Sequence, residues 1–371
     1  MTRQLAAAVT LAVAMVTSGC HPTGNDTHST APVVRGDINP RVIQSVVLGR
    51  GVGWVGYAAN RLVYAKSPTA DGPRSTVFSR DLTTGQTSLV ARSGFAHGMF
   101  AGAVAVGSWT VVVDQTGWRS PEDPRARWRV IAIDSRSHRR VVLATSGRGV
   151  TALIPVLKAS DGLAYWTSAE ADRSARESVW RAGWSKPRLL LRNAQMVPAS
   201  ESVGNDSMSF VGPGAKPGAT LASADCWQIP ITGGHPGPWT TSGLAMSCSA
   251  DGPNEAWTEH IEAHPKKVPA EGMSDEPYRL WLRIGGSAPR LVSQGYMSTL
   301  APLIIGRVLV WATLDDDPVF VDVDHLAPPR ALGRGALSQD PMADGSTLIL
   351  VHRSAAGSTS ADVVDMDPSG Y

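Results

Sequence analysis

The residues best suited to binding chemistry are cations that lie beside flat aromatic rings. Trp118, Arg119, Arg125 and Arg127 fall within one short stretch of the chain. Indole faces stack on sugar rings, and arginine both stacks and donates hydrogen bonds, so this set suits a glycan or a protein partner. Trp128, which follows directly, is expected to begin a strand and to face the core. We therefore predict a binding surface at the first four residues.

A second candidate site contains two histidines four positions apart. His260 and His264 lie near Glu259 and Glu262, and these residue types could approach a metal ion from one side. Spacing by four brings two side chains together only in a helix, and Pro265 keeps any helix there short. We therefore expect a solvated loop in which His260 and His264 contribute to binding, and we predict no metal site.

Motifs for nucleotide binding and for nucleophilic catalysis are weak or absent. Gly51, Gly53 and Gly56 satisfy the pattern G-x-G-x-x-G, but a strand resumes near Arg61, whereas a dinucleotide site needs a helix N-terminus for the pyrophosphate. We interpret these glycines as part of a crowded inner strand. The chain has no G-x-S-x-G elbow and no C-x-x-C pair. The sequence therefore predicts no catalytic residue and no cofactor.

Composition indicates an all-β chain with a large core. Of its 371 residues, 43% are hydrophobic and 18% are charged, which excludes disorder of the whole chain. The 37 glycines and 26 prolines punctuate the chain throughout, as is typical of strands joined by turns. The 34 basic residues barely exceed the 32 acidic ones, so the chain has no cationic excess for a phosphate backbone. We predict no nucleic-acid partner.

The amino terminus has the pattern of an export signal. Arg3 is the only charged residue before Cys20, and residues 5–16 are apolar except for Thr10. Twelve helical residues would extend about 18 Å, well short of the roughly 30 Å of bilayer hydrocarbon. We therefore expect this segment to be a signal and not a permanent membrane span.

Small residues lead to the first cysteine, in the run Val16-Thr17-Ser18-Gly19-Cys20. This segment resembles a bacterial lipoprotein signal with its lipobox, although Thr17 stands where that family usually has Leu or Val. The resemblance implies cleavage after residue 19, a diacylglyceryl group on Cys20, and a protein held on the extracytoplasmic face of the cell membrane. Several acyl chains hold a protein firmly in lipid. The alternative is an ordinary secretory signal.

Two further segments follow from this interpretation. Residues 20–39 are polar, contain Pro and Gly, and lack an apolar period, so we expect a flexible tether. The two remaining cysteines, Cys226 and Cys248, would lie in an oxidising compartment, where a disulfide can form. Two buried free thiols are the alternative.

A short phrase recurs through the rest of the chain. Each copy has a Gly, Asp or Asn turn and then a β-rich stretch with aromatic or branched residues. The seven copies are ANRLVYA (59–65), GSWTVVVD (107–114), DGLAYWTS (161–168), NDSMSFVG (205–212), PNEAWTE (253–259), GRVLVWAT (306–313) and GSTLILVH (345–352). A strand precedes most copies and a hairpin follows, which predicts four strands per unit. Their spacing is typical of propeller blades.

The ends of the chain predict how the ring closes. The last unit has about three strands and ends with residues 361–367, whereas an extra strand, residues 41–49, precedes the first unit. We therefore predict one seven-bladed β-propeller over residues 40–371, closed by its N-terminal strand, with six or eight blades as the alternatives. The phrase RDLTTGQTSLV, with Asp81 and Gly85, resembles a hairpin of TolB-like and YVTN-type propellers, which implies the architecture and no activity.

The longest connections are predicted between the second and third strands of each unit, at one face of the ring. Long irregular loops on a rigid scaffold are common binding sites, so we place the functional surface there, around the mouth of the central channel. The leading hypothesis is a lipid-anchored binding or scaffold protein for an envelope protein or glycan. The alternative is an extracytoplasmic enzyme, a hydrolase, a lyase or a cofactor-dependent oxidoreductase, with its site at the channel mouth.

Overall fold

The computed structural model describes residues 39–366, apart from 70–71, 117–126, 147–153, 161, 170–174, 195, 198–199, 205, 217, 220–222, 262–277, 296–300, 314–315, 327, 333–336 and 340. The predicted signal peptide 1–19, Cys20 and almost all of the tether 20–39 lie outside the described residues. Within the described part of the chain, no helix is long and apolar enough to cross a membrane.

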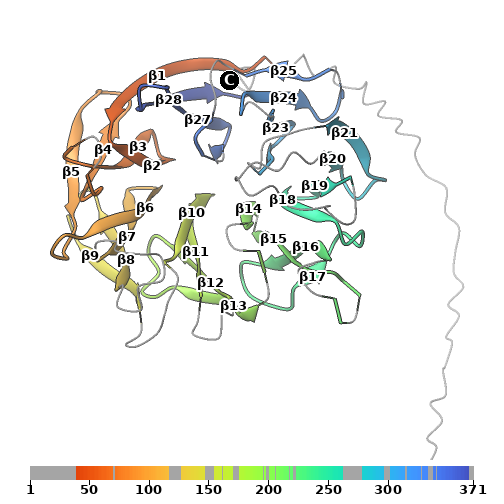
Figure 1. Ribbon diagram of the computed structural model, residues 1–371, viewed down its shortest axis with the longest axis horizontal. Helices are drawn as coiled ribbons and strands as arrows, with labels where there is room; N and C mark the ends of the chain where they lie inside the picture. The colour runs from red at the N-terminus through yellow and green to blue at the C-terminus, as the bar shows by residue number, and fades with distance from the viewer. Residues whose placement is uncertain are drawn as a thin grey trace, which may run out of the picture. The chain divides into compact units, whose positions relative to one another are not determined.

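The structure confirms an all-β propeller of seven four-stranded sheets, arranged around a ring (Figure 1). The first blade contains β2 (Val52–Ala58), β3 (Arg61–Lys66), β4 (Thr76–Asp81) and β5 (Thr87–Arg92). The second contains β6 (Met99–Val106), β7 (Trp109–Gln115), β8 (Trp128–Asp134) and β9 (Arg140–Thr145). The third contains β10 (Val156–Ser160), β11 (Leu163–Ala169), β12 (Ala175–Arg181) and β13 (Arg188–Ala194).

The remaining blades repeat this order. The fourth contains β14 (Ser202–Gly204), β15 (Ser207–Pro213), β16 (Ala224–Pro230) and β17 (Gly237–Pro238). The fifth contains β18 (Ala245–Asp251), β19 (Asn254–His260), β20 (Tyr278–Arg283) and β21 (Arg290–Gly295). The sixth contains β22 (Leu303–Ile305), β23 (Val308–Ala312), β24 (Pro318–Asp322) and β25 (Arg330–Ala331). The seventh contains β26 (Met342–Asp344), β27 (Thr347–Arg353), β28 (Ser358–Asp365) and β1 (Arg41–Arg50).

The seventh blade joins the two ends of the described chain. Strand β1 pairs antiparallel with β28, from Arg41 opposite Asp365 to Arg50 opposite Ser358. The N-terminal strand is thus the outer strand of the last blade, as the strand count predicts. This pairing closes the ring and leaves no blade incomplete.

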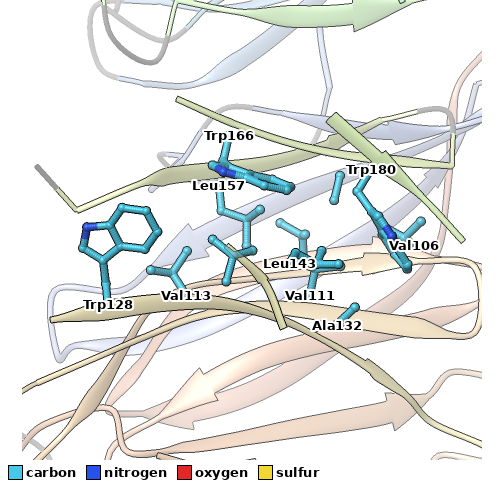
Figure 2. Packing of buried hydrophobic residues seen from close by; sticks show 12 residues of the cluster. Val106, Val111, Val113, Trp128, Ala132, Leu143, Leu157, Trp166 and Trp180 are labelled. Carbon is cyan, nitrogen blue, oxygen red and sulfur yellow. The ribbon is translucent and has the colours of Figure 1, made fainter. Parts of the chain in front are cut away.

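The hydrophobic core lies between neighbouring blades. Figure 2 shows one such layer, in which Val113 and Trp128 of the second blade face Trp166 and Trp180 of the third. Trp166 and Trp180 are each only 1% exposed, and Trp180 Nε1 donates a hydrogen bond to the Trp184 carbonyl at 3.0 Å. A buried indole with its N–H satisfied contributes a large apolar area at no polar cost. Trp128 begins β8 and is buried, as predicted.

The first two blades make close backbone contact at Gly56. A Cβ at this position would lie 2.7 Å from Val104 Cα on β6 and 3.0 Å from the Ala105 amide nitrogen. Only glycine fits such an approach without a backbone shift. The structure confirms that the glycine pattern in residues 51–56 belongs to a crowded inner strand.

Two faces of the ring follow from antiparallel pairing. The first strand of a blade starts at the face where its second strand ends, so the connections between blades and the connections between second and third strands share one face. We call this the loop face. It carries residues 67–69 and 72–75, between β3 and β4, and residues 354–357, between β27 and β28. The opposite face carries tight hairpins, such as Ala59-Asn60, both with positive φ.

Candidate functional site

A backbone bulge at Trp54 is the most distinctive feature of the channel. In the β2–β3 pair, Gly53 lies opposite Ala65 and Val55 lies opposite Tyr64, so Trp54 is an extra residue without a partner in the register. Its φ is 54°, in the left-handed region that bulky residues avoid. The Trp54 side chain remains 46% exposed. A strained, exposed tryptophan at the start of an inner strand is more typical of a binding site than of a core.

Similar bulges occur on two other innermost strands. The register of β6 against β7 shifts at Ala101, and that of β18 against β19 shifts at Met246. Met246 is 41% exposed. Only Trp54 combines the bulge with a positive φ among the described residues of these strands. Bulges therefore recur on the innermost strands of this ring, and in the first blade the bulged residue is a tryptophan.

Trp54 lines a cavity of about 140 Å³ in the central channel. Its wall comes from the innermost strands of several blades and is mainly apolar, with Val55, Val104, Leu157 and Leu303 among its residues. The remaining lining residues are Ala103, Lys158, Ala159, Ser160, Tyr165, Glu201, Ser202, Val203, Ala301, Pro302, Gln339, Pro341 and Met342. An apolar cavity with a few polar groups is the usual form of a ligand site.

A second cavity of about 100 Å³ adjoins the first and shares Trp54, Val55 and Gln339 with it. Its distinctive side chains are two arginines from the loop face. Arg74 lies between β3 and β4, and Arg353 ends β27. Within the part of the chain that the structure describes, none of the residues lining this cavity is acidic.

Gln339 connects the seventh blade to the first at the boundary between the two cavities. Val55 N donates to Gln339 Oε1 at 3.2 Å, and Gln339 Nε2 donates to the Val55 carbonyl at 2.9 Å. The side-chain amide thus pairs with both backbone groups of Val55, which follows the bulge. These two hydrogen bonds hold the backbone beside Trp54 in place.

A pair of buried glutamates lies between the third and fourth blades. In the order of the blades, this position is opposite the boundary between the seventh and first blades. Thr167 Oγ1 is 2.8 Å from Glu177 Oε2 and 2.9 Å from Glu201 Oε1. A hydroxyl has one proton, so it donates to only one carboxylate, and the other contact requires a protonated carboxyl group. The glutamates, which are 0% and 1% exposed, therefore hold one acidic proton between them.

The surroundings of Glu177 favour its protonated form. Burial raises the pKa of its carboxyl well above the ordinary value of 4.5, and the charge of Glu201 raises this pKa further. Lys158, whose Nζ donates to the Glu201 carbonyl oxygen at 3.2 Å, opposes this effect. When Glu177 is protonated, its carboxyl group donates to Thr167 and the Thr167 hydroxyl donates to Glu201. Glu201 lines the channel cavity, whereas Glu177 and Thr167 do not.

Only part of the sequence-predicted site falls within the described residues. Arg127 is exposed just before β8, and its backbone N–H donates to Thr116 Oγ1 at 3.0 Å. His260 ends β19, with its ring 5.1 Å from the ring of Tyr278. Neither residue lines the two cavities. Trp118, Arg119, Arg125 and His264 lie outside the described residues.

The two downstream cysteines meet across a blade boundary. Cys226 on β16 and Cys248 on β18 form a disulfide, with their Cα atoms 5.9 Å apart. Both residues are fully buried. The bond therefore joins the fourth blade to the fifth. Elsewhere in the described chain, no group of three or more His, Cys, Asp or Glu side chains could hold a metal ion.

Sequence reasoning missed Trp54, Arg74, Arg353 and the glutamate pair. Trp54 carried one usable signal, because a tryptophan flanked by Gly53 and Gly56 in an inner strand has little room to pack inward. The others have no local signature, since they come together only when the blades do.

Comparisons with known proteins support the fold. No protein-family model and no curated protein matches the chain. Solved structures do match: the β-propeller domain of the Trilobed protease from Pyrococcus furiosus has a TM-score of 0.55 and 8% identity, over 86% of this chain and 94% of that chain. That domain is described as having an open velcro topology, whereas β1 closes the last blade here.

Two other solved structures match over similar lengths. Acylaminoacyl peptidase from Pyrococcus horikoshii has a TM-score of 0.52 and 9% identity, over 83% of this chain and 49% of that chain. Oligogalacturonate lyase from Vibrio parahaemolyticus has a TM-score of 0.51 and 10% identity, over 90% of this chain and 98% of that chain. At such identities, the likeness shows the β-propeller fold and no activity.

Proposed function

We propose that this protein is a lipid-anchored, extracytoplasmic β-propeller that binds an envelope protein or glycan at the channel mouth on its loop face. The observation that carries the proposal is Trp54. It is 46% exposed, its backbone is strained, and it lines both cavities. An exposed aromatic ring on strained backbone adds little to folding stability, so its position is better explained by a ligand.

The compartment rests on sequence and on one structural feature. Cys20 follows an export signal and small residues, and two acyl chains or more would hold the protein on its membrane. The Cys226–Cys248 disulfide fits an oxidising compartment. Mass spectrometry of the mature amino terminus tests this part. We expect a diacylglyceryl-modified Cys20, and an unmodified terminus at another residue would overturn the anchor.

Site-specific crosslinking tests the binding site. A photoreactive amino acid replaces Trp54 in the full-length protein in its own membrane, and a matched variant carries it at Leu89, which is 45% exposed on the outer strand β5. We expect a defined product from position 54 that is absent at position 89. Equal products at both positions, or none at position 54, would reject the channel mouth as the binding site.

The glutamate pair favours a second candidate function, an extracytoplasmic enzyme. Two neighbouring carboxyl groups that share one proton are a common acid–base arrangement. Here only Glu201 lines the channel, so a reaction would need Glu177 to act through Thr167. Incubation of the full-length protein with envelope glycans and peptides tests this function. Turnover that Glu201→Gln abolishes would establish the enzyme, and crosslinking without turnover would favour the binding protein.

A further inference from the structure

The second cavity, next to Trp54, has the electrostatics of an anion site. Arg74 and Arg353 both line it, and no acidic residue is among the described residues that line it. Among the described residues, the Arg74 side chain has no hydrogen bond or ion pair. Arg353 Nη2 makes one long contact, 3.4 Å, with the Val52 carbonyl. Two guanidinium groups that share a cavity without a carboxylate repel each other unless an anion lies between them.

The pKa of Arg74 agrees with this geometry. Burial lowers the pKa of its guanidinium, and the positive charge of Arg353 lowers this pKa further. The protein therefore places Arg74 where its charged form is disfavoured. A bound oxyanion would reverse both effects, because it replaces lost hydration and screens the repulsion.

The absence of a side chain at Gly53 leaves the space that the Arg74 guanidinium occupies. A Cβ on residue 53 would overlap the Nε and Cζ atoms of Arg74, so the guanidinium lies directly over the glycine backbone. Gly53 also precedes the bulged Trp54. The same short segment thus seats an arginine on one side and exposes an indole beside it.

The adjoining channel cavity limits which chemical group the ligand can carry next to its anionic group. Its volume of about 140 Å³ and its apolar wall are close to those of a cavity that holds one benzene-sized apolar group. A sugar would leave most of its hydroxyl groups unpaired against such a wall. Glu201 adds a polar feature, since its buried Oε2 has no hydrogen-bond partner among the described residues. It can accept a hydrogen bond from a ligand N–H.

We propose that the channel mouth takes an acidic peptide segment, with its carboxylate between Arg74 and Arg353 and a neighbouring apolar side chain in the channel cavity. This inference rests on the proposed binding function and specifies its ligand. Arginine forks pair with carboxylates in a bidentate geometry, a leucine-sized side chain fits the apolar cavity, and a peptide N–H matches Glu201. The partner is thus a protein whose exposed segment, or C-terminus, carries this combination.

Two small probes separate the contribution of the carboxylate to binding from that of the rest of the ligand. N-acetyl-leucine has the apolar side chain and the carboxylate, whereas N-acetyl-leucinamide lacks only the carboxylate. Calorimetry of the full-length protein in detergent, at fixed pH and ionic strength, reports binding as a rise in Tm. We expect N-acetyl-leucine to raise Tm by about 2 °C for each tenfold excess over its Kd, and the amide to give no comparable rise.

Three variants test the arginine pair. Arg74→Gln and Arg353→Gln each remove one charge, and Gly53→Ala keeps both charges but displaces the Arg74 guanidinium. We expect all three to lose the response to N-acetyl-leucine. The matched controls are Arg92→Gln, an exposed arginine outside both cavities, and Gly237→Ala, where a Cβ meets nothing within 4 Å. Both controls should respond like the unmodified protein.

The ligand-free proteins add an independent readout. Because the unfilled pair is repulsive, Arg353→Gln should keep or raise Tm in the absence of ligand, whereas a merely structural arginine would lower it. Equal responses to the acid and the amide, or a response that survives Gly53→Ala, would overturn the proposal. If inorganic phosphate alone gives the arginine-dependent rise, the ligand is a phosphate ester and the peptide is rejected. Loss of every anion response with intact crosslinking at position 54 would reject only this inference.

Discussion

Glu177 and Glu201, which belong to neighbouring blades, contact the same hydroxyl group, that of Thr167, at 2.8 and 2.9 Å. One proton therefore has to be added to the pair for both contacts to be hydrogen bonds. The network joins the third blade to the fourth and ends at the channel wall through Glu201. Its protonation is thus linked both to stability and to the channel.

The first prediction concerns the pH dependence of stability. The pKa of Glu177 is raised in the folded protein, so its contribution is fully present below the ordinary glutamate pKa and is lost as pH rises toward the folded value. Glu177→Gln keeps a donor to Thr167 but does not ionise. We expect the variant to gain stability relative to the parent as pH rises above about 4.5. Urea unfolding across this range measures the difference, and a constant difference would contradict the protonated pair.

The second prediction concerns the disulfide between the fourth and fifth blades. Cys226 and Cys248 are separated by 22 positions, a loop for which the chain-entropy model gives a stabilisation of about 3 kcal/mol. Replacing both residues with Ala should lower the free energy of unfolding by that amount or more, since two buried side chains also shrink. Reduction of the parent should give a smaller loss in the same direction. No change on reduction would mean that the bond is absent.

The third prediction concerns the contact between the first two blades. Gly56→Ala would place a Cβ 2.7 Å from Val104 Cα, so one strand has to shift. We expect a loss of about 1–3 kcal/mol, typical of overpacking. Gly237→Ala, with open space around the new methyl group, is the control and should change stability little. Similar values for both variants would show that β2 and β6 are not in close contact.

The fourth prediction separates binding from stability at Trp54. Its φ of 54° favours glycine, and relief of a left-handed backbone is worth about 1 kcal/mol or more. Because the indole is half exposed, Trp54→Gly should retain or raise the free energy of unfolding while it weakens binding of N-acetyl-leucine. Trp54→Ala keeps the backbone strain and should weaken binding without the gain. A large loss of stability in Trp54→Gly would make the indole a core residue.

Local sequence patterns were sufficient to predict the architecture. Each of the seven phrases proved to be the second strand of a blade, and Asp81 and Gly85 form the predicted hairpin, with the Asp81 carboxylate accepting the Thr83 and Thr84 N–H groups at 2.9 and 2.8 Å. The N-terminal strand closes the last blade. These features depend on alternation and turn chemistry over a few residues, which a sequence displays directly.

Local sequence patterns did not predict the residues of the candidate site. Residues near 118–127 and His260 were expected to bind, yet of these the described Arg127 and His260 line neither cavity. Trp54 lies within the glycine pattern of residues 51–56, but Arg74, Gln339 and Arg353 belong to no motif and are distant from one another in the chain. Gln339 reaches Val55 across 284 positions, which is possible only because ring closure places the last blade beside the first.

The sequence by itself therefore determined the seven blades and the strand that completes the last one, because short-range patterns along the chain display both. Only the tertiary structure decided which side chains face the channel, which glutamates contact the same hydroxyl group and which arginines share a cavity. Those properties depend on burial and on distances between blades, and neither quantity exists until β1 pairs with β28 and the ring is complete.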